Sequence, residues 1–403
     1  MKTRLMIALA LAGASSGAWA SSALLIEKPL PAVSAGDRTS GGVVSAPLPP
    51  GQFEREPVQF AWALDPSDAV SAPMVEVMES RSFWRTVEAA ELQRGVEVEL
   101  SAPGAVIQLS PAAGARALPA QSLKVRDAAN RVMDTRQFES AQLQQAGMAV
   151  TPGTQLLKLE SGDIGRYRLQ AADGQGRYVL QVLEPNSPVV LRARTDRAVA
   201  FAGSRISLQV DMDGAQSAAA SLAQRLARAP LVGQGLLVAP DGRTWDVPLQ
   251  AGRGGGLSST VALPAEGSDA PGLWELQVFA EQGGIARDTR LAFAVSRPTA
   301  RIAGSIRATN LADLRFPLQV GAPGRYEVRA TLFATGSDGQ LRPVAQGHSA
   351  AWFNAAGAGQ LRLSFAGVAL PAGYGAPYEL REVELHDQSR MAPIERRARA
   401  LRF

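Results

Sequence analysis

The sequence predicts an all-β protein built from three consecutive β-sandwich-type modules. Short segments in which apolar and polar side chains alternate recur along the chain, and Gly, Pro or Ser bounds each of them. The 403 residues include 39 glycines and 26 prolines, which are the residue types that favour tight turns between strands. An alternating strand buries one face and exposes the other, as strands of a sandwich do.

The first 20 residues have the pattern of a bacterial secretory signal peptide. Lys2 and Arg4 precede an apolar run at residues 5–12, and residues 18–20 form an A-x-A cleavage pattern. Residues 1–20 are therefore expected to be removed on export to the periplasm or the medium. Residues 21–56 are expected to be a disordered lead-in, because prolines and glycines interrupt any regular period there.

The N-terminal β domain is expected over residues 57–186. Its strands are predicted at residues 58–62, 96–100, 105–109, 155–159, 167–170 and 178–183. A stretch without Gly or Pro at residues 137–146 predicts a short helix that ends at Gly147.

A domain boundary is expected at residues 184–188, where two prolines flank an Asn-Ser pair. The second module then covers residues 187–298 and the third covers residues 299–403. Pro240-Asp241-Gly242 predicts a hairpin in the second module, and residues 217–229 are either a helix or an alanine-rich loop. Further strands of these two modules are predicted at residues 206–210, 235–238, 244–247, 273–279, 291–295, 326–332, 360–365 and 378–385.

One short pattern recurs in all three modules. A glycine is followed two residues later by an aromatic residue and then by an alternating strand, with Tyr167, Trp274 and Tyr326 as the aromatic residues. In β-sandwiches such an aromatic residue packs inward, or its hydroxyl ties the corner before a late core strand. An aromatic platform for sugars is the alternative interpretation, but core packing explains three separate strand starts better.

The chain resembles an uncharacterised family of exported proteins from Legionella- and Xanthomonas-like proteobacteria. The resemblance is carried by SRSFW at residues 80–84, APGAVIQLSP at 102–111 and LEPNSP at 183–188, and it extends over the whole mature chain. It implies three consecutive β domains, of which the second and third are immunoglobulin-like. Because the family is a domain-of-unknown-function group, the resemblance implies a fold and assigns no catalytic residues.

Composition excludes several classes of function. With no cysteine, the chain forms no disulfides and has no thiolate chemistry. The 41 basic and 37 acidic residues nearly balance, and neither sign forms a long block, unlike a nucleic-acid-binding surface. Beyond the leader, no apolar run is long enough to span a bilayer.

Candidate catalytic groups are few. The chain has two histidines, His348 and His386, and no turn motif supplies a nucleophile for either of them, although Asp387 follows His386. We interpret His386, which ends an alternating strand, as a surface or strand-end residue. The pairs Glu97 with Glu99 and Glu382 with Glu384 each share one face of an alternating strand. Each pair is therefore expected to lie on a solvated face rather than across a cleft.

Two further motifs lack the context that their functions require. Asp211 and Asp213 resemble the start of a calcium loop, but the later ligands are missing. The glycine-rich residues 252–256 lead towards a strand rather than a helix, so they predict a hairpin tip and not a phosphate loop. We therefore predict no catalytic, cofactor-binding or metal-binding residues.

These observations predict an exported, non-catalytic binding protein whose partner is another envelope or secreted protein, or a cell-surface component. One alternative is a carbohydrate-binding protein, for which exposed aromatics such as Trp84, Trp245 or Trp352 would line one flat face. A second alternative is a hydrolase, which requires a cleft that gathers His348 or His386 with carboxylates from separate strands. No nucleic-acid partner, membrane span or cofactor is expected.

Overall fold

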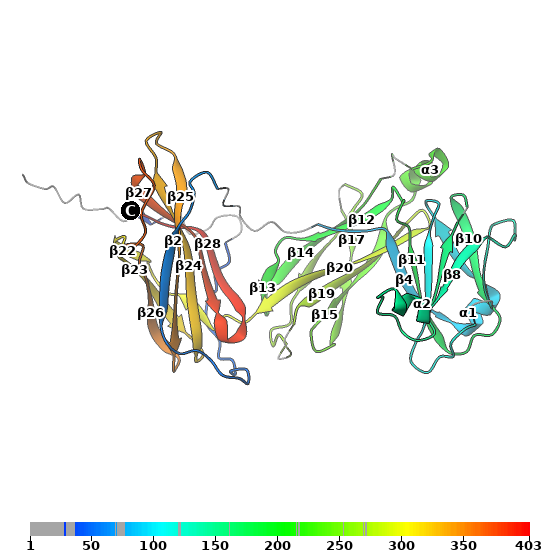
Figure 1. Ribbon diagram of the computed structural model, residues 1–403, viewed down its shortest axis with the longest axis horizontal. Helices are drawn as coiled ribbons and strands as arrows, with labels where there is room; N and C mark the ends of the chain where they lie inside the picture. The colour runs from blue at the N-terminus through cyan, green and yellow to red at the C-terminus, as the bar shows by residue number, and fades with distance from the viewer. Residues whose placement is uncertain are drawn as a thin grey trace, which may run out of the picture.

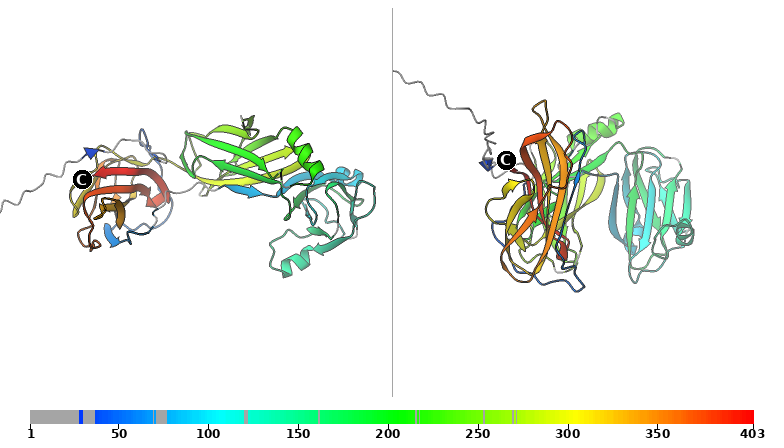
Figure 2. Two further views of the ribbon diagram at one scale, coloured as in Figure 1. Left: turned by 90° about the horizontal axis from the view of Figure 1, so that it is seen from above. Right: turned by 60° about the vertical axis from the view of Figure 1, so that its left-hand side comes forward.

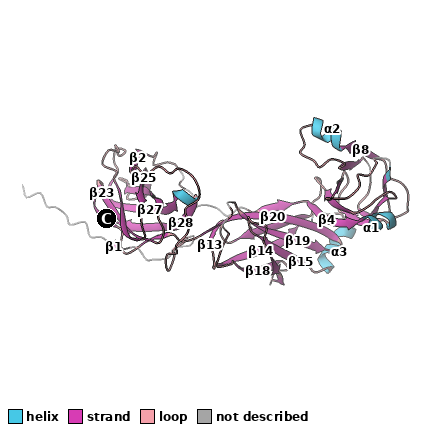
Figure 3. Ribbon diagram, turned by 90° about the horizontal axis from the view of Figure 1, so that it is seen from below, coloured by secondary structure: helices cyan, strands magenta, loops and turns pink. Residues whose placement is uncertain are grey.

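The computed structural model describes residues 28–29, 37–68, 70, 77–119, 122–160, 162–214, 216, 218–252, 254–268, 270 and 272–403. The predicted signal peptide at residues 1–20 lies outside these residues. Strands dominate the described part of the chain and the helices are short (Figure 3). The prediction of an all-β protein is therefore confirmed. No helix among the described residues is long and apolar enough to cross a membrane.

The strands form three units that lie in a row, with the middle unit between the other two (Figures 1 and 2). Each unit consists of two sheets that enclose a separate cluster of buried apolar side chains. The recorded strand pairs are antiparallel except β13 with β20, which is parallel. The predicted strands that the structure describes are found at or near their expected positions.

The first unit contains a three-stranded and a five-stranded sheet. The first sheet has the order β5 (Val96–Leu100), β10 (Gly165–Ala171), β7 (Leu123–Arg126). The second has the order β4 (Ser82–Glu88), β11 (Arg177–Leu183), β6 (Val106–Pro111), β9 (Gln155–Leu159), β8 (Thr135–Glu139).

The middle unit contains two five-stranded sheets. One has the order β17 (Gln250–Ala251), β18 (Leu257–Ala262), β14 (Arg205–Asp213), β12 (Val190–Thr195), β3 (Met78–Ser80). The other has the order β13 (Val199–Phe201), β20 (Ile285–Ser296), β19 (Trp274–Gln282), β15 (Val232–Val238), β16 (Thr244–Pro248).

The C-terminal unit contains a six-stranded and a four-stranded sheet. The larger has the order β1 (Lys28–Pro29), β28 (Ala392–Arg402), β27 (Gly375–Asp387), β24 (Gly324–Thr335), β25 (Leu341–Phe353), β2 (Val58–Ala63). In the smaller, β23 (Asp313–Val320) pairs with β21 (Ala300–Ile302), β22 (Arg307–Asn310) and β26 (Gly357–Leu363).

The helices correct one detail of the sequence interpretation. The helix α2 (Ser140–Gln145) starts later than predicted, because residues 137–139 complete strand β8. The helix α1 (Ala89–Arg94) begins with a reciprocal capping box between Glu88 and Glu91. The alanine-rich stretch forms the helix α3 (Ala220–Arg228), because Leu222 and Leu226 lie one turn apart and are both buried.

The recurrent glycine–aromatic pattern is architectural, as predicted. Tyr167, Trp274 and Tyr326 are all buried. The Tyr167 hydroxyl donates to the backbone oxygen of Asp163, and the Tyr326 hydroxyl donates to that of Ala322, each at 2.7 Å. In both cases the acceptor lies four residues upstream, which ties the corner before the strand.

Replacing Tyr326 with phenylalanine is expected to destabilise the C-terminal unit by about 1–2 kcal/mol, because two buried carbonyl groups lose their donor. The Tyr326 hydroxyl contacts the oxygens of Ala322 and Thr299, and burial raises the pKa of Tyr326 to about 12. Denaturant unfolding of Tyr326→Phe and of the control Tyr374→Phe measures the difference, since the Tyr374 hydroxyl binds an exposed arginine. An equal loss of unfolding free energy in the two variants would contradict the stabilising role of the Tyr326 hydroxyl.

The N-terminal segment (residues 37–63) corrects two predictions: the disordered lead-in at 21–56, over its described residues 37–56, and the start of the N-terminal domain at 57. This segment runs along the C-terminal unit instead (Figure 1). Arg38 exchanges two backbone hydrogen bonds with Arg396, each of 2.9 Å, and the whole of β2 pairs with β25. The strand at 58–62 was therefore predicted correctly, but it belongs to a different unit.

After β2 the chain returns through the middle unit before it reaches the first. Strand β3 pairs with β12, so the first unit proper begins at β4. The lead-in has no apolar period of its own. Its order comes from distant side chains: Arg325 Nη1 donates to the backbone oxygens of Glu54 (3.1 Å) and Glu56 (2.7 Å). A sequence pattern does not show such non-local partners.

Candidate functional site

The free edge of the six-stranded sheet carries a row of exposed apolar side chains. Strand β2 is the last strand of this sheet, and Ala61 packs against the core. Because side chains alternate along a strand, Val58, Phe60 and Trp62 share the opposite face. Their exposed fractions are 42%, 50% and 38%. The strand thus packs the small Ala61 side chain against the core and leaves its three large apolar side chains on the outer face.

Phe60, Trp62 and His348 form one ring cluster, here called the aromatic edge. His348 lies on β25 directly opposite Phe60. Its ring centroid is 5.1 Å from those of both Phe60 and Trp62, and the Phe60 and Trp62 centroids are 5.6 Å apart. The planes of Phe60 and Trp62 differ by 18°. Two half-exposed rings therefore cover the imidazole, whose side chain is only 14% exposed.

A buried carboxylate fixes the orientation of His348. Glu327 on β24 accepts from His348 Nδ1 at 2.7 Å and from Gln388 Nε2 at 2.9 Å, and it forms an ion pair with Arg329 at 3.1 Å. Burial alone would raise the pKa of Glu327, but these partners outweigh burial and lower it. An ionised carboxylate only accepts hydrogen bonds, so Nδ1 of His348 carries the proton.

The second histidine lies on the same outer face of the sheet. His386 is opposite Glu327 in the β24–β27 register, and His386 Nε2 is 3.0 Å from Glu384 Oε2. This hydrogen bond lowers the pKa of Glu384. Arg396 forms ion pairs with Glu382 and Glu384. The face therefore combines rings with fixed donors and acceptors from four strands.

Carboxylates hold both histidines of this face. In the described part of the chain, each histidine binds a carboxylate and neither forms a hydrogen bond to a serine hydroxyl. No group of three or more potential ligands could hold a metal ion among the described residues. The Nε atom of Arg329, opposite His348 on the neighbouring strand, is buried without a partner. The outer face of the six-stranded sheet therefore presents both aromatic rings and hydrogen-bonding side chains.

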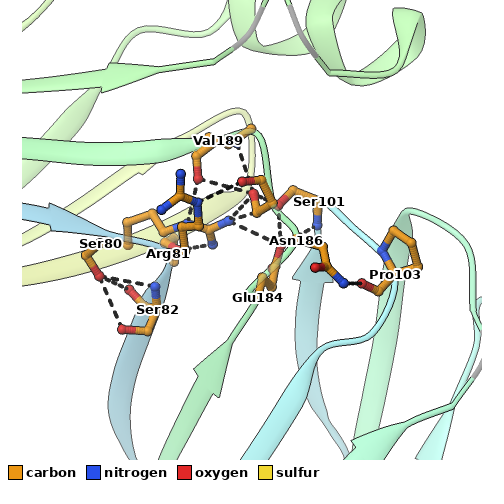
Figure 4. A network of polar contacts seen from close by, with 11 residues as sticks. Ser80, Arg81, Ser82, Ser101, Pro103, Glu184, Asn186 and Val189 are labelled. Carbon is orange, nitrogen blue, oxygen red and sulfur yellow. Dashed lines mark hydrogen bonds and ion pairs between the residues drawn. The ribbon is translucent and has the colours of Figure 1, made fainter.

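A second polar cluster joins the first and middle units (Figure 4). Arg287 Nη2 lies 3.2 Å from Glu184 Oε2, and both side chains are fully buried. Arg287 also donates to the hydroxyls of Ser101 (2.8 Å) and Ser187 (3.0 Å) and to the backbone oxygen of Val189 (3.2 Å). These residues come from both units, so the cluster fastens the junction predicted at residues 184–188.

A cleft of about 480 Å³ opens beside this junction. Its lining includes Trp84 and Glu97 of the first unit and Phe279 of the middle unit. The Trp84 and Phe279 rings meet edge to face at 5.4 Å. The Trp84 backbone N–H donates to Asp288, whose pKa burial raises to about 6.

This raised pKa predicts that the junction becomes more stable as the pH falls from 7 to 5. The folded state binds the Asp288 proton more tightly than the unfolded state does, so the penalty for the charged form is relieved below pH 6. The effect is on the order of 1 kcal/mol, because Asp288 is only partly buried. Asp288→Asn should stabilise the protein at pH 7.5 and not at pH 4.5, in denaturant unfolding at both pH values. An equal change in the free energy of unfolding at both pH values would contradict the raised pKa of Asp288.

Two family models match the chain. They are the N-terminal domain of the domain of unknown function DUF4785, at residues 49–184, and its C-terminal domain, at residues 299–403. The chain belongs to the DUF4785 family. The predicted resemblance to an uncharacterised family is thereby confirmed. The aromatic edge of this DUF4785 chain combines residues from both matched ranges, since Phe60 and Trp62 lie in the first and His348 in the second.

One solved structure supports the fold over most of the chain. It is a DUF4785 family protein of Legionella pneumophila, with 18% identity, a TM-score of 0.67, and coverage of 90% of this chain and 98% of that one. The native conformation of Escherichia coli alpha-2-macroglobulin is 12% identical and covers 82% of this chain and 20% of that one. Its TM-score is 0.28, too low to carry an argument. No curated protein matches the chain.

The tryptophans named from the sequence do not form one face of this DUF4785 protein. Trp84 lies at the junction with the middle unit, Trp245 in the middle unit and Trp352 in the C-terminal unit, and all three are partly buried. The exposed rings are Phe60 and Trp62 instead. The signal that could have found them is the uncharged run at residues 58–63, in which large residues alternate with Gln or Ala.

The carboxylate pairs and loop motifs lie largely where the sequence placed them. Glu97 is exposed and pairs with Arg166 of the first unit, as expected for a solvated face. Glu99 differs from the expectation: it is only 12% exposed, pairs at 2.7 Å with Arg225 of the middle unit, and lines the cleft at the junction together with Glu97. Asp213 pairs with Arg192 at 2.7 Å. Among the described residues of the predicted hairpin tip, the Gly252 N–H donates to the Gly256 oxygen at 2.7 Å between β17 and β18, which agrees with a hairpin.

Proposed function

We propose that this DUF4785 protein is an exported, non-catalytic binding protein that contacts its partner through the aromatic edge. The observation that carries the proposal is the exposure of Phe60 and Trp62 on an edge strand. Large aromatic residues are enriched at the centres of protein interfaces, where their burial contributes most of the binding energy. The partner is another envelope or secreted protein or a cell-surface component.

Export is supported by the pattern of residues 1–20, in which a basic start, an apolar run and an A-x-A sequence follow one another. The test is to express the full chain with a C-terminal tag and to sequence the N-terminus of the exported product. Cleavage after Ala20 is the expected result. An uncleaved chain in the cytoplasm would contradict this part of the proposal.

Binding is tested with the mature chain, from Ser21 onward, immobilised and exposed to native envelope extract and culture supernatant. Wild-type protein is compared with Phe60→Ala/Trp62→Ala and with the matched control Met391→Ala, which replaces an exposed apolar residue outside the aromatic edge. We expect a stoichiometric partner on the wild type and the control, with at least a tenfold loss on the double variant. Equal recovery of the partner on all three immobilised proteins would contradict the aromatic edge as the binding site. Turnover of a hydrolase substrate would contradict the non-catalytic assignment.

A carbohydrate ligand is the second candidate, and a specific observation favours it. Two exposed rings lie on the same face of the sheet as the partly exposed His386–Glu384 pair, and sugar hydroxyls require such polar groups as well as a stacking surface. Co-sedimentation of the same three proteins with isolated cell-wall polysaccharide decides between a carbohydrate and a protein ligand.

A further inference from the structure

We propose that two copies of this chain pair through the free edges of their β2 strands, so that the two six-stranded sheets become one continuous sheet. The occupant of the edge is thus a second copy of the same chain. The interaction lies on the strand that bears the proposed binding site; its hydrogen bonds use the backbone edge, and the side chains of β2 add cross-strand contacts.

Strand β2 lacks the features that keep edge strands from pairing. Proteins protect such edges with charged residues, prolines or bulges. Residues 58–63 contain no charge and no proline, and the β2–β25 register is regular over its whole length. All six residues are exposed or partly exposed. A flat, apolar edge of this kind favours the addition of another strand.

The backbone groups needed for pairing are available on the outer side. Leu64 donates its backbone N–H to Val344 on the β25 side, at 3.0 Å. Because backbone groups alternate between the two sides of a strand, those of Gln59 and Ala61 point away from β25. Neither residue forms a backbone hydrogen bond to another element in the described part of the chain.

An antiparallel pair centred on Phe60 satisfies both the backbone and the side chains. In this register Gln59 of one copy exchanges hydrogen bonds with Ala61 of the other. The two Phe60 residues then face each other, and Val58 of each copy faces Trp62 of the other. Pairs of aromatic with β-branched or aromatic residues are the stabilising cross-strand pairs of antiparallel sheets. Two-fold symmetry doubles the Gln59–Ala61 and Val58–Trp62 contacts, while the Phe60–Phe60 contact lies on the axis and occurs once.

The same register also brings together oppositely charged residues that flank β2 in the two copies. Five residues to either side of Phe60, Arg55 precedes the strand and Asp65 follows it, and both are exposed. Antiparallel pairing about Phe60 brings the Arg55 end of each copy towards the Asp65 end of the other, just beyond the paired residues 58–63. Within one copy, Arg55 lies over the Trp352 ring at 4.8 Å and Asp65 accepts from the Ser67 hydroxyl at 2.7 Å. A shift by one residue would separate these charges and place the aromatic residues on opposite faces.

Sedimentation velocity of the mature chain over a concentration series tests the proposal. A strand pair buries less surface than a standard interface, so the expected dimer has a Kd on the order of 10–100 μM. Ala61→Pro removes an outward N–H without touching the β25 ladder, a position at which edge strands tolerate proline. This variant should remain monomeric, with an unchanged far-ultraviolet spectrum and intact rings.

Charge variants test the register. Arg55→Glu and Asp65→Arg should each weaken self-association about tenfold, because each places like charges opposite one another. An equimolar mixture of the two variants should recover wild-type association, since only the mixed dimer pairs opposite charges on both sides.

A chain that stays monomeric at the highest concentration, a dimer that persists in Ala61→Pro, or a mixture that shows no recovery would each overturn the inference. The proposed function has a separate outcome. If the chain is monomeric but binds a protein or polysaccharide that Phe60→Ala/Trp62→Ala loses, the inference fails and the proposed function stands. If the chain dimerises as described but binds no other protein or polysaccharide, the inference stands and the proposed function fails.

Discussion

Replacing Arg287 with methionine is expected to lower the free energy of unfolding of the first and middle units by about 3–5 kcal/mol. The substitution leaves the carboxylate of Glu184 fully buried without its ion partner. It also removes the donor to the Ser101 and Ser187 hydroxyls. A buried charge without a partner is among the most destabilising changes known in proteins, whereas an apolar replacement of the whole pair is much milder.

The measurement is denaturant unfolding of Arg287→Met, Glu184→Leu and the double variant, followed by tryptophan fluorescence. Because Trp84 lies at this junction, its emission reports on the transition. The double variant should be more stable than the sum of the single effects predicts, by at least 1 kcal/mol, since neither charge remains unpaired. Additive losses would show that the two groups act independently and would contradict the ion pair.

Removal of residues 21–63 is expected to destabilise the C-terminal unit by on the order of 5 kcal/mol. The deletion takes the edge strand β2 away and exposes one side of β25. It also leaves Arg390 without the backbone oxygens of Ala46 (2.8 Å) and Pro47 (3.1 Å), and each lost bond to a charged donor costs about 1.5–3 kcal/mol. The first and middle units should keep their stability, because their cores contain no residue of this segment.

Calorimetry of the mature chain and of two truncations measures this effect. The control truncation removes only residues 21–27, which precede β1, and should leave the transition of the C-terminal unit within a few degrees of the wild type. If both truncated chains unfold like the mature protein, the N-terminal segment is not part of the C-terminal unit.

Local patterns explain why so much of the fold could be predicted. Alternation along a strand and turn residues at its ends depend only on neighbours in the sequence, so strands such as Val96–Leu100 were located correctly. The corners at Tyr167 and Tyr326 were also predictable, because the hydroxyl and its acceptor lie four residues apart. The pairing of β2 with β25 was not, because it joins residues almost 290 positions apart, such as Phe60 and His348.

The candidate site was missed for the same reason. Phe60 and Trp62 were assigned to a strand of the wrong unit, and the exposure of their side chains was not predicted. From the sequence, His348 had no partner beyond an alternative hydrolase cleft, whereas three strands bring it together with these rings and with Glu327. The composition of a strand indicates that it forms, but the neighbour that it meets decides which of its faces is exposed.

Amide hydrogen exchange of the mature chain tests the central claim most directly, namely that the N-terminal segment supplies the edge strand of the C-terminal unit. Peptides that cover residues 58–63 and 345–350 are followed by mass spectrometry in the dilute, monomeric protein. We predict that Phe60 and Trp62, whose backbone groups face β25, exchange far more slowly than an unstructured chain. Residues 345–350 should lose protection when residues 21–63 are deleted. Exchange of residues 58–63 at the rate of an unfolded peptide would contradict the claim and, with it, the aromatic edge.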